Sequence, residues 1–185
     1  MSSSETELIR SSQSGDSDAF GKLYELYVRK IYDFIYYKTH HKETAEDLTS
    51  QTFFKALEKI RTFKTERGSF NSWIYQIARN IVTDHYRSSK TNLNIDDIWD
   101  LHNDDDVERD ADTRLQLEKV HSYLQKLKPE QREILLLRLW NDLSFKEIAE
   151  IVGKSEANCK MIVHRALGKL QTDLLIALIL LFSHS

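Results

Sequence analysis

Residues 143–155 read LSFKEIAEIVGKS, which is the pattern of a short helix closed at both ends. Ser144 and Glu147 have the spacing of a capping box, in which each side chain bonds the backbone N–H of the other residue. Gly153 suits the left-handed conformation that ends a helix, and Ser155 can cap a second helix immediately afterwards. Two short helices around a glycine-containing turn predict a helix-turn-helix.

The second helix of such a motif lies in the major groove of DNA, with its N-terminal half at the base edges. The residues expected to face inward are Ala157, Ile162 or Val163, Ala166 and Leu170. The residues expected to face outward are Glu156, Asn158, Lys160, Met161, His164, Arg165 and Lys169. Asn158 can read adenine, Met161 can touch a thymine methyl, and Lys160 or Arg165 can bind guanine or phosphate. A plain solvated helical hairpin is the alternative, and a DNA-binding motif alone fits any repressor or recombinase.

The composition of the 185-residue chain favours an all-α fold. It has only five Gly and one Pro, whereas the hairpins of a sheet-rich fold use many turn-forming residues. The single cysteine, Cys159, excludes an internal disulfide and fits a reducing cytosol, and it is expected to be a small core residue.

The charges divide the chain into three segments. Residues 1–90 carry 14 Lys and Arg against 12 Asp and Glu, and residues 113–185 carry 11 against eight. Residues 91–112, which we call the acidic linker, carry nine acids and one Arg. Self-repulsion there favours an extended or disordered tether. We therefore predict two small helical domains, 1–90 and 113–185, joined by a flexible acidic linker.

Helical spacing of apolar residues predicts three helices in the first domain. The first follows a cap at Asp16 or Ser17 and runs past Ile35. The second, from about Thr44 to Ile60, is expected to bury Leu48, Phe53, Ala56, Leu57 and Ile60. The third, from near Ser69, is expected to bury Phe70, Trp73, Ile74, Ile77, Ala78 and Ile81. In the second domain, Leu117 to Leu127 marks a helix, and Pro129 suits the first turn of the next.

The third helix also combines aromatic rings with cations, which suits unpaired bases because the bases stack while the backbone follows positive charge. The members of this set are Phe63, Phe70, Trp73 and Tyr75 with Arg67, Arg79 and Arg87. Phe70 and Trp73 fit the buried stripe. Tyr75, Arg79 and Asn80 lie off it, so for them core packing and nucleic-acid binding both stay open.

Four motifs in series carry a family resemblance. They are residues 45–56 (AEDLTSQTFFKA), 69–80 (SFNSWIYQIARN) with Asp84 and Arg87 after them, 127–135 (LKPEQREIL), and the helix-turn-helix. Together they resemble the extracytoplasmic-function (ECF) group of the sigma-70 family. The resemblance implies a cytoplasmic transcription initiation factor that needs no cofactor and catalyses nothing itself. Its implied partners are promoter DNA, the beta-prime clamp and beta flap of core RNA polymerase, and an anti-sigma factor.

The resemblance also implies which residues make the contacts. Those for the polymerase clamp are Asp47, Leu48, Gln51, Thr52, Phe54 and Lys55. Those for the minus-ten element are Phe63, Arg67, Asn71, Tyr75, Gln76, Arg79, Asn80, Thr83 and Arg87. Those for the minus-thirty-five element are Arg132, Lys146, Ser155, Glu156, Asn158, Lys160, Met161, His164, Arg165 and Lys169. Of the clamp set, Asp47, Gln51 and Phe54 fall about one turn apart and are expected to share an outward face.

Other patterns are weaker. His40 and His41 with Glu43 and Glu46 can be drawn as a metal site, but no second cluster has ligand spacing, so no metal is expected. The apolar run from Leu174 to Phe182 is about half the length that spans a bilayer, and the Ser-rich start has no signal-peptide pattern. The rival functions are a stand-alone helix-turn-helix regulator and a recombinase, and the second lacks a convincing nucleophile with activating partners.

Overall fold

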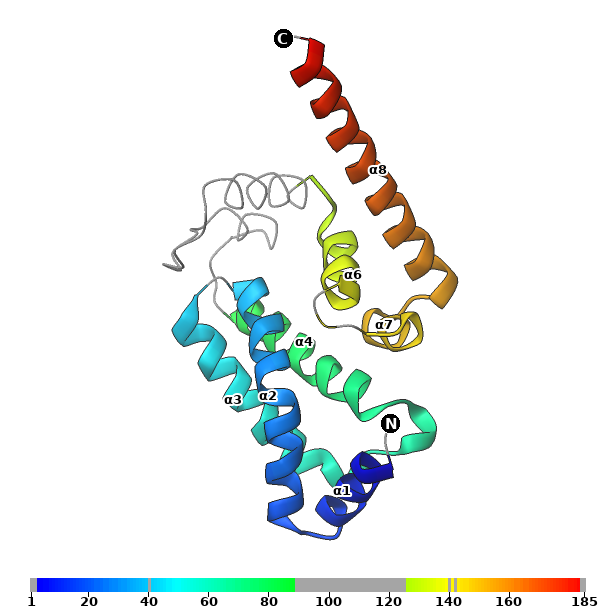
Figure 1. Cartoon of the computed structure of the whole chain (residues 1–185). Coiled ribbons are helices and arrows are strands. Elements are labelled where there is room, and N and C mark those ends of the chain that lie inside the picture. Colours follow the sequence, from blue (N-terminus) through cyan, green and yellow to red (C-terminus); the bar gives the residue numbers. More distant parts are fainter. Residues whose placement is uncertain (1–2, 40, 89–125, 140, 142, 184–185) are drawn as a thin grey trace. The chain divides into compact units, whose positions relative to one another are not determined.

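The computed structural model describes residues 3–39, 41–88, 126–139, 141 and 143–183. Helices account for the regular structure of these residues, and no strand occurs among them, so the predicted all-α class is confirmed (Figure 1). The chain divides into two compact units, Met1–His102 and Asn103–Ser185, each with its own core. The acidic linker, and the helix expected over Leu117 to Leu127 as far as residue 125, lie outside the described residues.

The first unit is a bundle built around its second helix. Its elements are α1 (Ser3–Gln13), α2 (Ser17–Thr39), α3 (Lys42–Lys59), the 3₁₀ turns η1 (Ile60–Thr62) and η2 (Thr65–Arg67), and α4 (Phe70–Ser88). Helix α2 packs against α1, α3 and α4, and α4 also packs against α3. Because α4 has neighbours on two sides, it buries a wider part of its surface than a single stripe.

A cluster of aromatic rings fixes the start of α4. Phe70 is fully buried, and its ring lies 5.3 Å from Tyr27, 5.7 Å from Phe63 and 5.4 Å from Trp73. Further along, Tyr75 meets Phe34 of α2 edge-on at 5.2 Å. Such tilted and edge-on ring pairs stabilise a core beyond the area that they bury. The cluster therefore joins α2, the turn after α3 and the first turns of α4.

The helix ends follow from local hydrogen bonds. Asp16 caps α2 by accepting from the backbone N–H groups of Asp18 and Ala19, which confirms one of the two expected caps. Helix α3 begins at Lys42, two residues before the expected Thr44, because the His41 side chain accepts from the Thr44 N–H. Helix α1 was not expected from its Ser-rich sequence, yet Ile9 anchors it in the core with 1% of its surface exposed.

One expected core residue of this unit is wrong. Leu57 is 48% exposed, whereas Phe53 and Ile60 are buried as expected. Leu57 lies near the end of α3, where the chain turns into η1, and the described elements cover its side chain only in part. Trp73 is half-buried rather than fully enclosed, at the edge of the aromatic cluster.

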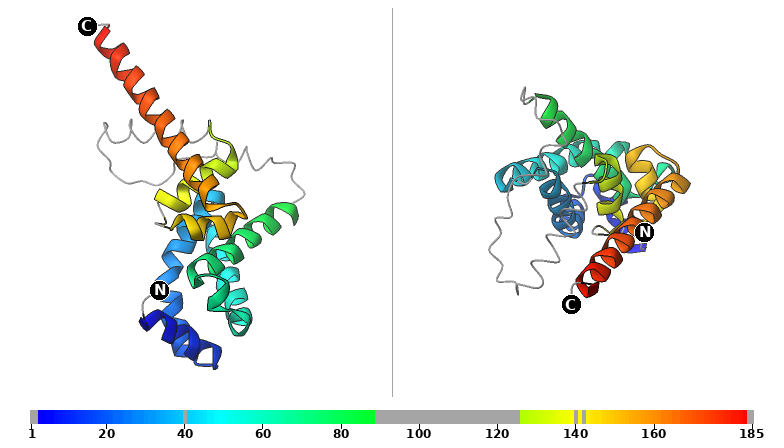
Figure 2. Two further views of the ribbon diagram at one scale, coloured as in Figure 1. Left: turned by 90° about the vertical axis from the view of Figure 1, so that its right-hand side faces the viewer. Right: turned by 90° about the horizontal axis from the view of Figure 1, so that it is seen from above.

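The second unit contains the expected helix-turn-helix. Its described helices are α6 (Pro129–Leu139), α7 (Phe145–Val152) and α8 (Glu156–Ser183). Ser144 and Glu147 form both hydrogen bonds of the capping box, and Gly153 ends α7 with a φ of 71°. Ser155 accepts from the Asn158 N–H and so caps α8. Helix α8 continues past Leu170 to Ser183, farther than the motif required (Figure 2).

The core of this unit includes Ile134, Leu137, Leu143 and Ile148, all fully enclosed. Cys159 is also fully buried, which confirms it as a small core residue, and burial raises the pKa of its thiol. Among the described helices, none combines the length and apolar character needed to cross a membrane.

The capping box makes the stability of α7 testable. Ser144→Ala removes the side chain that accepts from the Glu147 N–H, and loss of an N-cap costs about 1 kcal/mol. We expect faster hydrogen exchange of the α7 amides in this variant. The control is Lys146→Ala, an exposed position where the change is expected to stay within about 0.5 kcal/mol. Equal protection of α7 in both variants would contradict a stabilising role for the cap.

Candidate functional surfaces

An outward face of α3 brings together three residues that the sequence placed on one side of a helix. The Gln51 amide donates to the Asp47 carboxylate at 2.8 Å, which orients both side chains at the surface. Phe54, one turn later, is 66% exposed. We call Asp47, Gln51 and Phe54 the α3 surface. An exposed aromatic ring beside oriented polar groups is typical of a protein interaction site.

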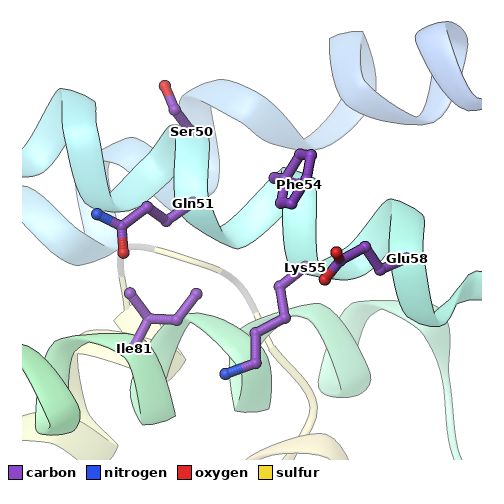
Figure 3. Close-up of a pocket in the computed structure, with 6 residues that line it drawn as sticks. All are labelled: Ser50, Gln51, Phe54, Lys55, Glu58 and Ile81. Atoms are coloured by element: carbon purple, nitrogen blue, oxygen red, sulfur yellow. The ribbon is translucent and has the colours of Figure 1, made fainter.

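Next to this surface lies an open hollow between α3 and α4 (Figure 3). Its lining residues are Ser50, Gln51, Phe54, Lys55 and Glu58 of α3 with Ile81 of α4. Lys55 and Glu58 add one charge of each sign to the rim. A partner that contacts Phe54 can therefore extend into the hollow and meet polar groups at its edge.

Two residues of the predicted clamp set do not belong to this surface. Leu48 is 1% exposed and Thr52 is fully buried, and the Thr52 hydroxyl donates to the Leu48 carbonyl at 2.7 Å. These residues are four apart, so they lie on the same inward face of α3. No direct contact with the clamp is therefore proposed for these two residues. Leu48 and Thr52 instead hold α3 against the rest of the unit.

The polar side of α4 carries five of the predicted minus-ten residues. They are Gln76, Arg79, Asn80, Thr83 and Arg87, which we call the α4 polar row. Asn80 and Arg87 are exposed, and the other three are half-buried. The Thr83 hydroxyl donates to the Arg79 carbonyl at 2.8 Å. Amide, hydroxyl and guanidinium groups in one row can hydrogen-bond to base edges and phosphates.

The aromatic members of the minus-ten set lie in the core instead. Tyr75 is fully buried and Phe63 is 6% exposed, and Phe63 packs on Trp73 at 5.2 Å. A ring whose faces are covered by protein has no face left on which a base can stack. No direct DNA contact is proposed for Tyr75 or Phe63, because Tyr75 packs on Phe34 of α2 and Phe63 packs within the aromatic cluster. Asn71 is half-buried, and the side chain of Arg67 lies outside the described part.

The outward face of α8 contains Lys160, Met161, His164, Arg165 and Lys169, all exposed, while Asn158 is half-buried. The Lys160 ammonium lies 2.7 Å from the Glu156 carboxylate and 5.9 Å from the centre of the Phe145 ring. Both partners of this ion pair are about half-exposed, so the pair contributes little to stability and can be exchanged for a phosphate.

The first buried residue of α8 is Cys159, two residues after Ala157, which the sequence places on the inward face. Cys159, Val163 and Ala166 form the buried stripe, whereas Ala157 is exposed. The spacing of four and three between these buried residues is helical, and it agrees with the expectation that Cys159 is a small core residue. Ala157 therefore adds a methyl group to the outward face, beside Met161, which is 43% exposed.

Three minus-thirty-five residues outside the middle of α8 have different surroundings. Arg132 is 3% exposed and donates to the Leu127 carbonyl at 3.2 Å, so no direct DNA contact is proposed for it. Its guanidinium is used within the unit, at the start of α6. Lys146 is exposed on α7, and Ser155 is exposed but serves as the cap of α8.

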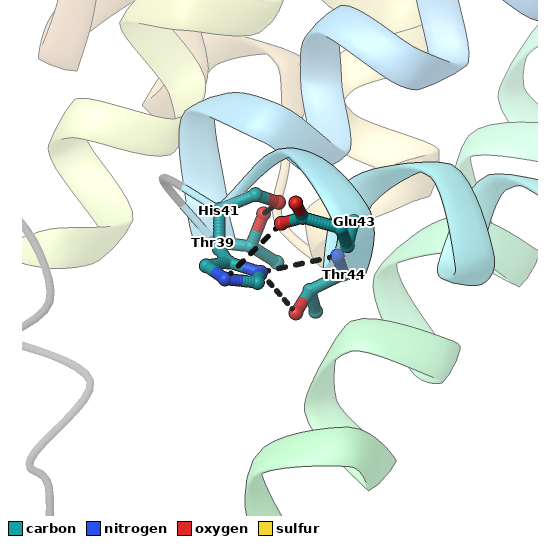
Figure 4. Close-up of polar contacts among 4 residues, drawn as sticks. All are labelled: Thr39, His41, Glu43 and Thr44. Carbon is teal, nitrogen blue, oxygen red and sulfur yellow. Dashed lines mark hydrogen bonds and ion pairs between the residues drawn. The ribbon is translucent and has the colours of Figure 1, made fainter. Parts of the chain in front are cut away.

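His41, from the pattern that can be drawn as a metal site, caps α3 instead (Figure 4), and His40 lies outside the described residues. His41 Nδ1 accepts from the Thr44 N–H, and Nε2 lies 3.2 Å from the Glu43 carboxylate. With Nδ1 as the acceptor, the neutral ring carries its proton on Nε2, toward Glu43. Among the described residues, no three potential ligands gather in a group.

The sequence also matches known families and proteins. Residues 23–91 match sigma-70 region 2, and residues 117–170 match sigma-70 region 4. The chain is 31% identical over 161 residues to the RNA polymerase sigma factor YlaC of Bacillus subtilis, covering 85% of this chain and 92% of YlaC. It is 38% identical over 169 residues to the ECF RNA polymerase sigma factor BldN of Streptomyces coelicolor, covering 89% of this chain but 63% of BldN.

A solved structure has a similar fold. It is the sigma factor RpoE in complex with the anti-sigma factor NepR from Bartonella quintana, with a TM-score of 0.63 and 24% identity. The likeness covers 84% of this chain and 96% of that one. Taken with the sequence matches, these findings show that the chain belongs to the ECF group of the sigma-70 family of RNA polymerase sigma factors.

The different surroundings of Tyr75 and Asn80 predict different effects of truncation. Tyr75→Ala removes a fully buried ring, and such changes cost about 3–5 kcal/mol of unfolding free energy. Asn80→Ala alters an exposed side chain and is expected to stay within about 0.5 kcal/mol. Denaturant unfolding, followed by hydrogen exchange in α4, measures both. Similar stabilities for the two variants would contradict the burial of Tyr75.

Proposed function

We propose that the protein directs core RNA polymerase to specific promoters and helps to open the DNA there. It acts in the cytoplasm as a binding subunit, without a cofactor and without catalysing a reaction itself. The observation that carries this proposal is that the α3 surface and the α4 polar row are two separate outward faces of one unit. One face is suited to a protein partner and the other to nucleic acid, so the unit can join the polymerase to its promoter.

The proposal gives each segment of the chain a role. Residues 1–90 form the domain that binds the clamp and the minus-ten element, and residues 113–185 bind the minus-thirty-five element. Residues 91–112 connect them, and their nine acids would keep this linker in the positively lined path that RNA otherwise follows through the polymerase. The beta flap would contact the second domain, and an anti-sigma factor would hold the protein inactive.

The α3 surface supports clamp binding through two kinds of contact. Phe54 offers a large apolar area that becomes buried on docking, and Asp47 offers a negative charge that Gln51 already orients. A pre-oriented charge loses less conformational entropy on binding than a mobile one. Such a charge fits a cationic group on the polymerase, which is the kind of contact that sets specificity and association rate.

The α4 polar row supports strand opening through hydrogen bonds rather than stacking. Separating promoter strands costs a few kcal/mol per unstacked base, and groups that bind only unpaired bases offset this cost. Asn80 has an exposed amide that can pair with base edges, and Arg87 has an exposed guanidinium for the phosphate backbone. Binding of the opened strand by these groups offsets the free-energy cost of unstacking, so strand opening needs no other energy source.

The outward face of α8 supports reading of duplex DNA. Ala157 lies in the first turn, where a recognition helix meets base edges, and with Met161 it forms an apolar patch suited to a thymine methyl. Lys160 and Arg165 flank this patch with cations for guanine or phosphate. The face thus combines base readout with contacts to the backbone.

A stand-alone helix-turn-helix regulator is not favoured. Such a protein has no use for a separate helical unit that carries an exposed Phe54 and a second polar row. It would also bind its duplex tightly without polymerase.

The proposed function is tested by run-off transcription with purified core polymerase on a promoter library, using the wild-type protein and Asp47→Arg. We expect selective transcripts from the wild type. We expect Asp47→Arg to weaken core binding by roughly tenfold or more, because the reversed charge opposes a cationic partner. Glu25→Arg, exposed on α2 and outside the α3 surface, is the charge-matched control and should retain binding. Tight duplex binding without polymerase, and no transcripts with it, would contradict the proposal.

The Glu156–Lys160 ion pair makes a second outcome testable in the polymerase complex. Glu156→Gln frees the Lys160 ammonium, so promoter affinity should rise and the salt dependence should steepen by about one counterion. Lys160→Ala should relax preference within the minus-thirty-five element, costing roughly 1–3 kcal/mol at one base pair, whereas Arg165→Ala should weaken all promoters alike. Binding at two salt concentrations to promoters that differ at this element measures all three. Unchanged slopes and preferences would refute this orientation of α8.

A further inference from the structure

Helix α1 has no role in the proposed contacts. It precedes residue 23, where the match to sigma-70 region 2 begins. It nevertheless packs against both α2 and η1, and η1 directly precedes the loop between α3 and α4 (Figure 1). We call residues 64–69 the α3–α4 loop. Helix α1 is linked to the start of this loop by hydrogen bonds of Gln13, its last residue.

Gln13, the last residue of α1, joins two chain segments that are far apart in sequence. Its side-chain amide nitrogen donates to the Ile60 carbonyl at 3.1 Å and to the Phe63 carbonyl at 2.8 Å. Ile60 opens η1, and Phe63 is the residue immediately before the α3–α4 loop. One amide group, with its two N–H donors, therefore satisfies two backbone carbonyls at the point where the loop leaves the helix.

A second contact of α1 reaches the other end of the loop. The Tyr27 hydroxyl of α2 donates to the Glu5 carboxylate of α1, and the Tyr27 ring lies 5.3 Å from Phe70. Phe70 is the first residue of α4, immediately after the loop. Both ends of the loop are therefore linked to α1. Before the loop, the Phe63 carbonyl accepts from Gln13. After it, Phe70 packs on the Tyr27 ring, whose hydroxyl is held by Glu5.

Between these fixed ends, the α3–α4 loop is short and mostly exposed. Lys64, Thr65 and Glu66 are exposed, and Gly68 adopts a φ of 150°. A short loop with fixed ends has few available conformations, so its cation Lys64 and its backbone groups keep a defined position at the start of α4. The loop leads directly into α4, whose outward side carries the α4 polar row.

We propose that Gln13 is a positioning residue for strand capture. By donating to Ile60 and Phe63 it holds the α3–α4 loop in the conformation that receives unpaired bases of the promoter, and α1 thereby adjusts promoter opening without touching DNA. This inference rests on the proposed function, because it takes single-stranded promoter DNA as the ligand of the α4 side of the unit.

The chain offers variants that separate the hydrogen bonds from the packing. Gln13→Glu keeps the shape but replaces the donor by a carboxylate that faces two carbonyl oxygens, and Gln13→Met keeps the length with no polar group. Gln13→Lys restores a donor of similar reach. Ser14→Ala is the matched control, since the exposed Ser14 hydroxyl, directly after α1, donates to the Arg10 carbonyl and not to the turn after α3 among the described residues.

The test uses the full chain in complex with core polymerase and measures binding of two single-stranded oligonucleotides, one with the promoter's non-template minus-ten sequence and one with that sequence scrambled. We expect the ratio of the two affinities to fall about fivefold in Gln13→Glu and Gln13→Met, from the loss of hydrogen bonds that orient the loop. It should recover in Gln13→Lys and stay unchanged in Ser14→Ala. Binding to core polymerase should be equal in all variants.

Transcription gives an independent readout. Gln13→Glu should lower open-complex formation on a duplex promoter and retain more activity on a template already mismatched at the minus-ten site. An unchanged oligonucleotide ratio in both Gln13→Glu and Gln13→Met would overturn the role of Gln13, as would a fall in core binding by the same factor. If the wild-type complex itself shows no preference between the two oligonucleotides, the proposed function fails instead.

Discussion

The first unit depends on the packing of α4 between α2 and α3 around Phe70. This ring contacts Tyr27, Phe63 and Trp73, which come from different elements, so it fixes where α4 starts and how it is rotated. Once that rotation is fixed, Tyr75 must lie inside and Asn80 outside. The groups available to DNA are therefore those that the core leaves uncovered. Truncating Phe70 would disturb function by rotating or loosening α4, even though this residue touches no ligand.

The second unit depends on precise helix ends, because it has only a small core. The capping box at Ser144 and the left-handed Gly153 set the angle between α7 and α8. The Arg138 guanidinium adds to this by donating to the Leu143 carbonyl and lying 5.1 Å from the Phe145 ring. These contacts fix the rotation of α8 so that Ala157 and Met161 are exposed. Polar residues that look like DNA ligands, such as Arg132, are used to build this geometry.

The two kinds of surface on the first unit explain how one small domain can serve two partners. Phe54 and Asp47 lie on α3, while Asn80 and Arg87 lie on α4, and an open hollow lined by both helices lies beside the α3 surface. A partner on α3 can therefore bind without covering the polar row. Helix α1 supports the same arrangement, since Gln13 bonds the Phe63 carbonyl before the α3–α4 loop and Glu5 bonds Tyr27, whose ring packs on Phe70 after the loop.

The sequence by itself determined the helical class, the helix-turn-helix with its caps, and the outward face of α3. These features depend on periodicity and on hydrogen bonds within a few residues, which a sequence records directly. Only the tertiary structure decided the fate of Thr52, Phe63, Tyr75 and Arg132, which are buried, and of Leu57 and Ala157, which are exposed. The reason is that burial depends on how many neighbours a helix has and on which sides, and those neighbours are distant in sequence. Gln13 shows the same limit, because its carbonyl partners lie 47 and 50 residues away.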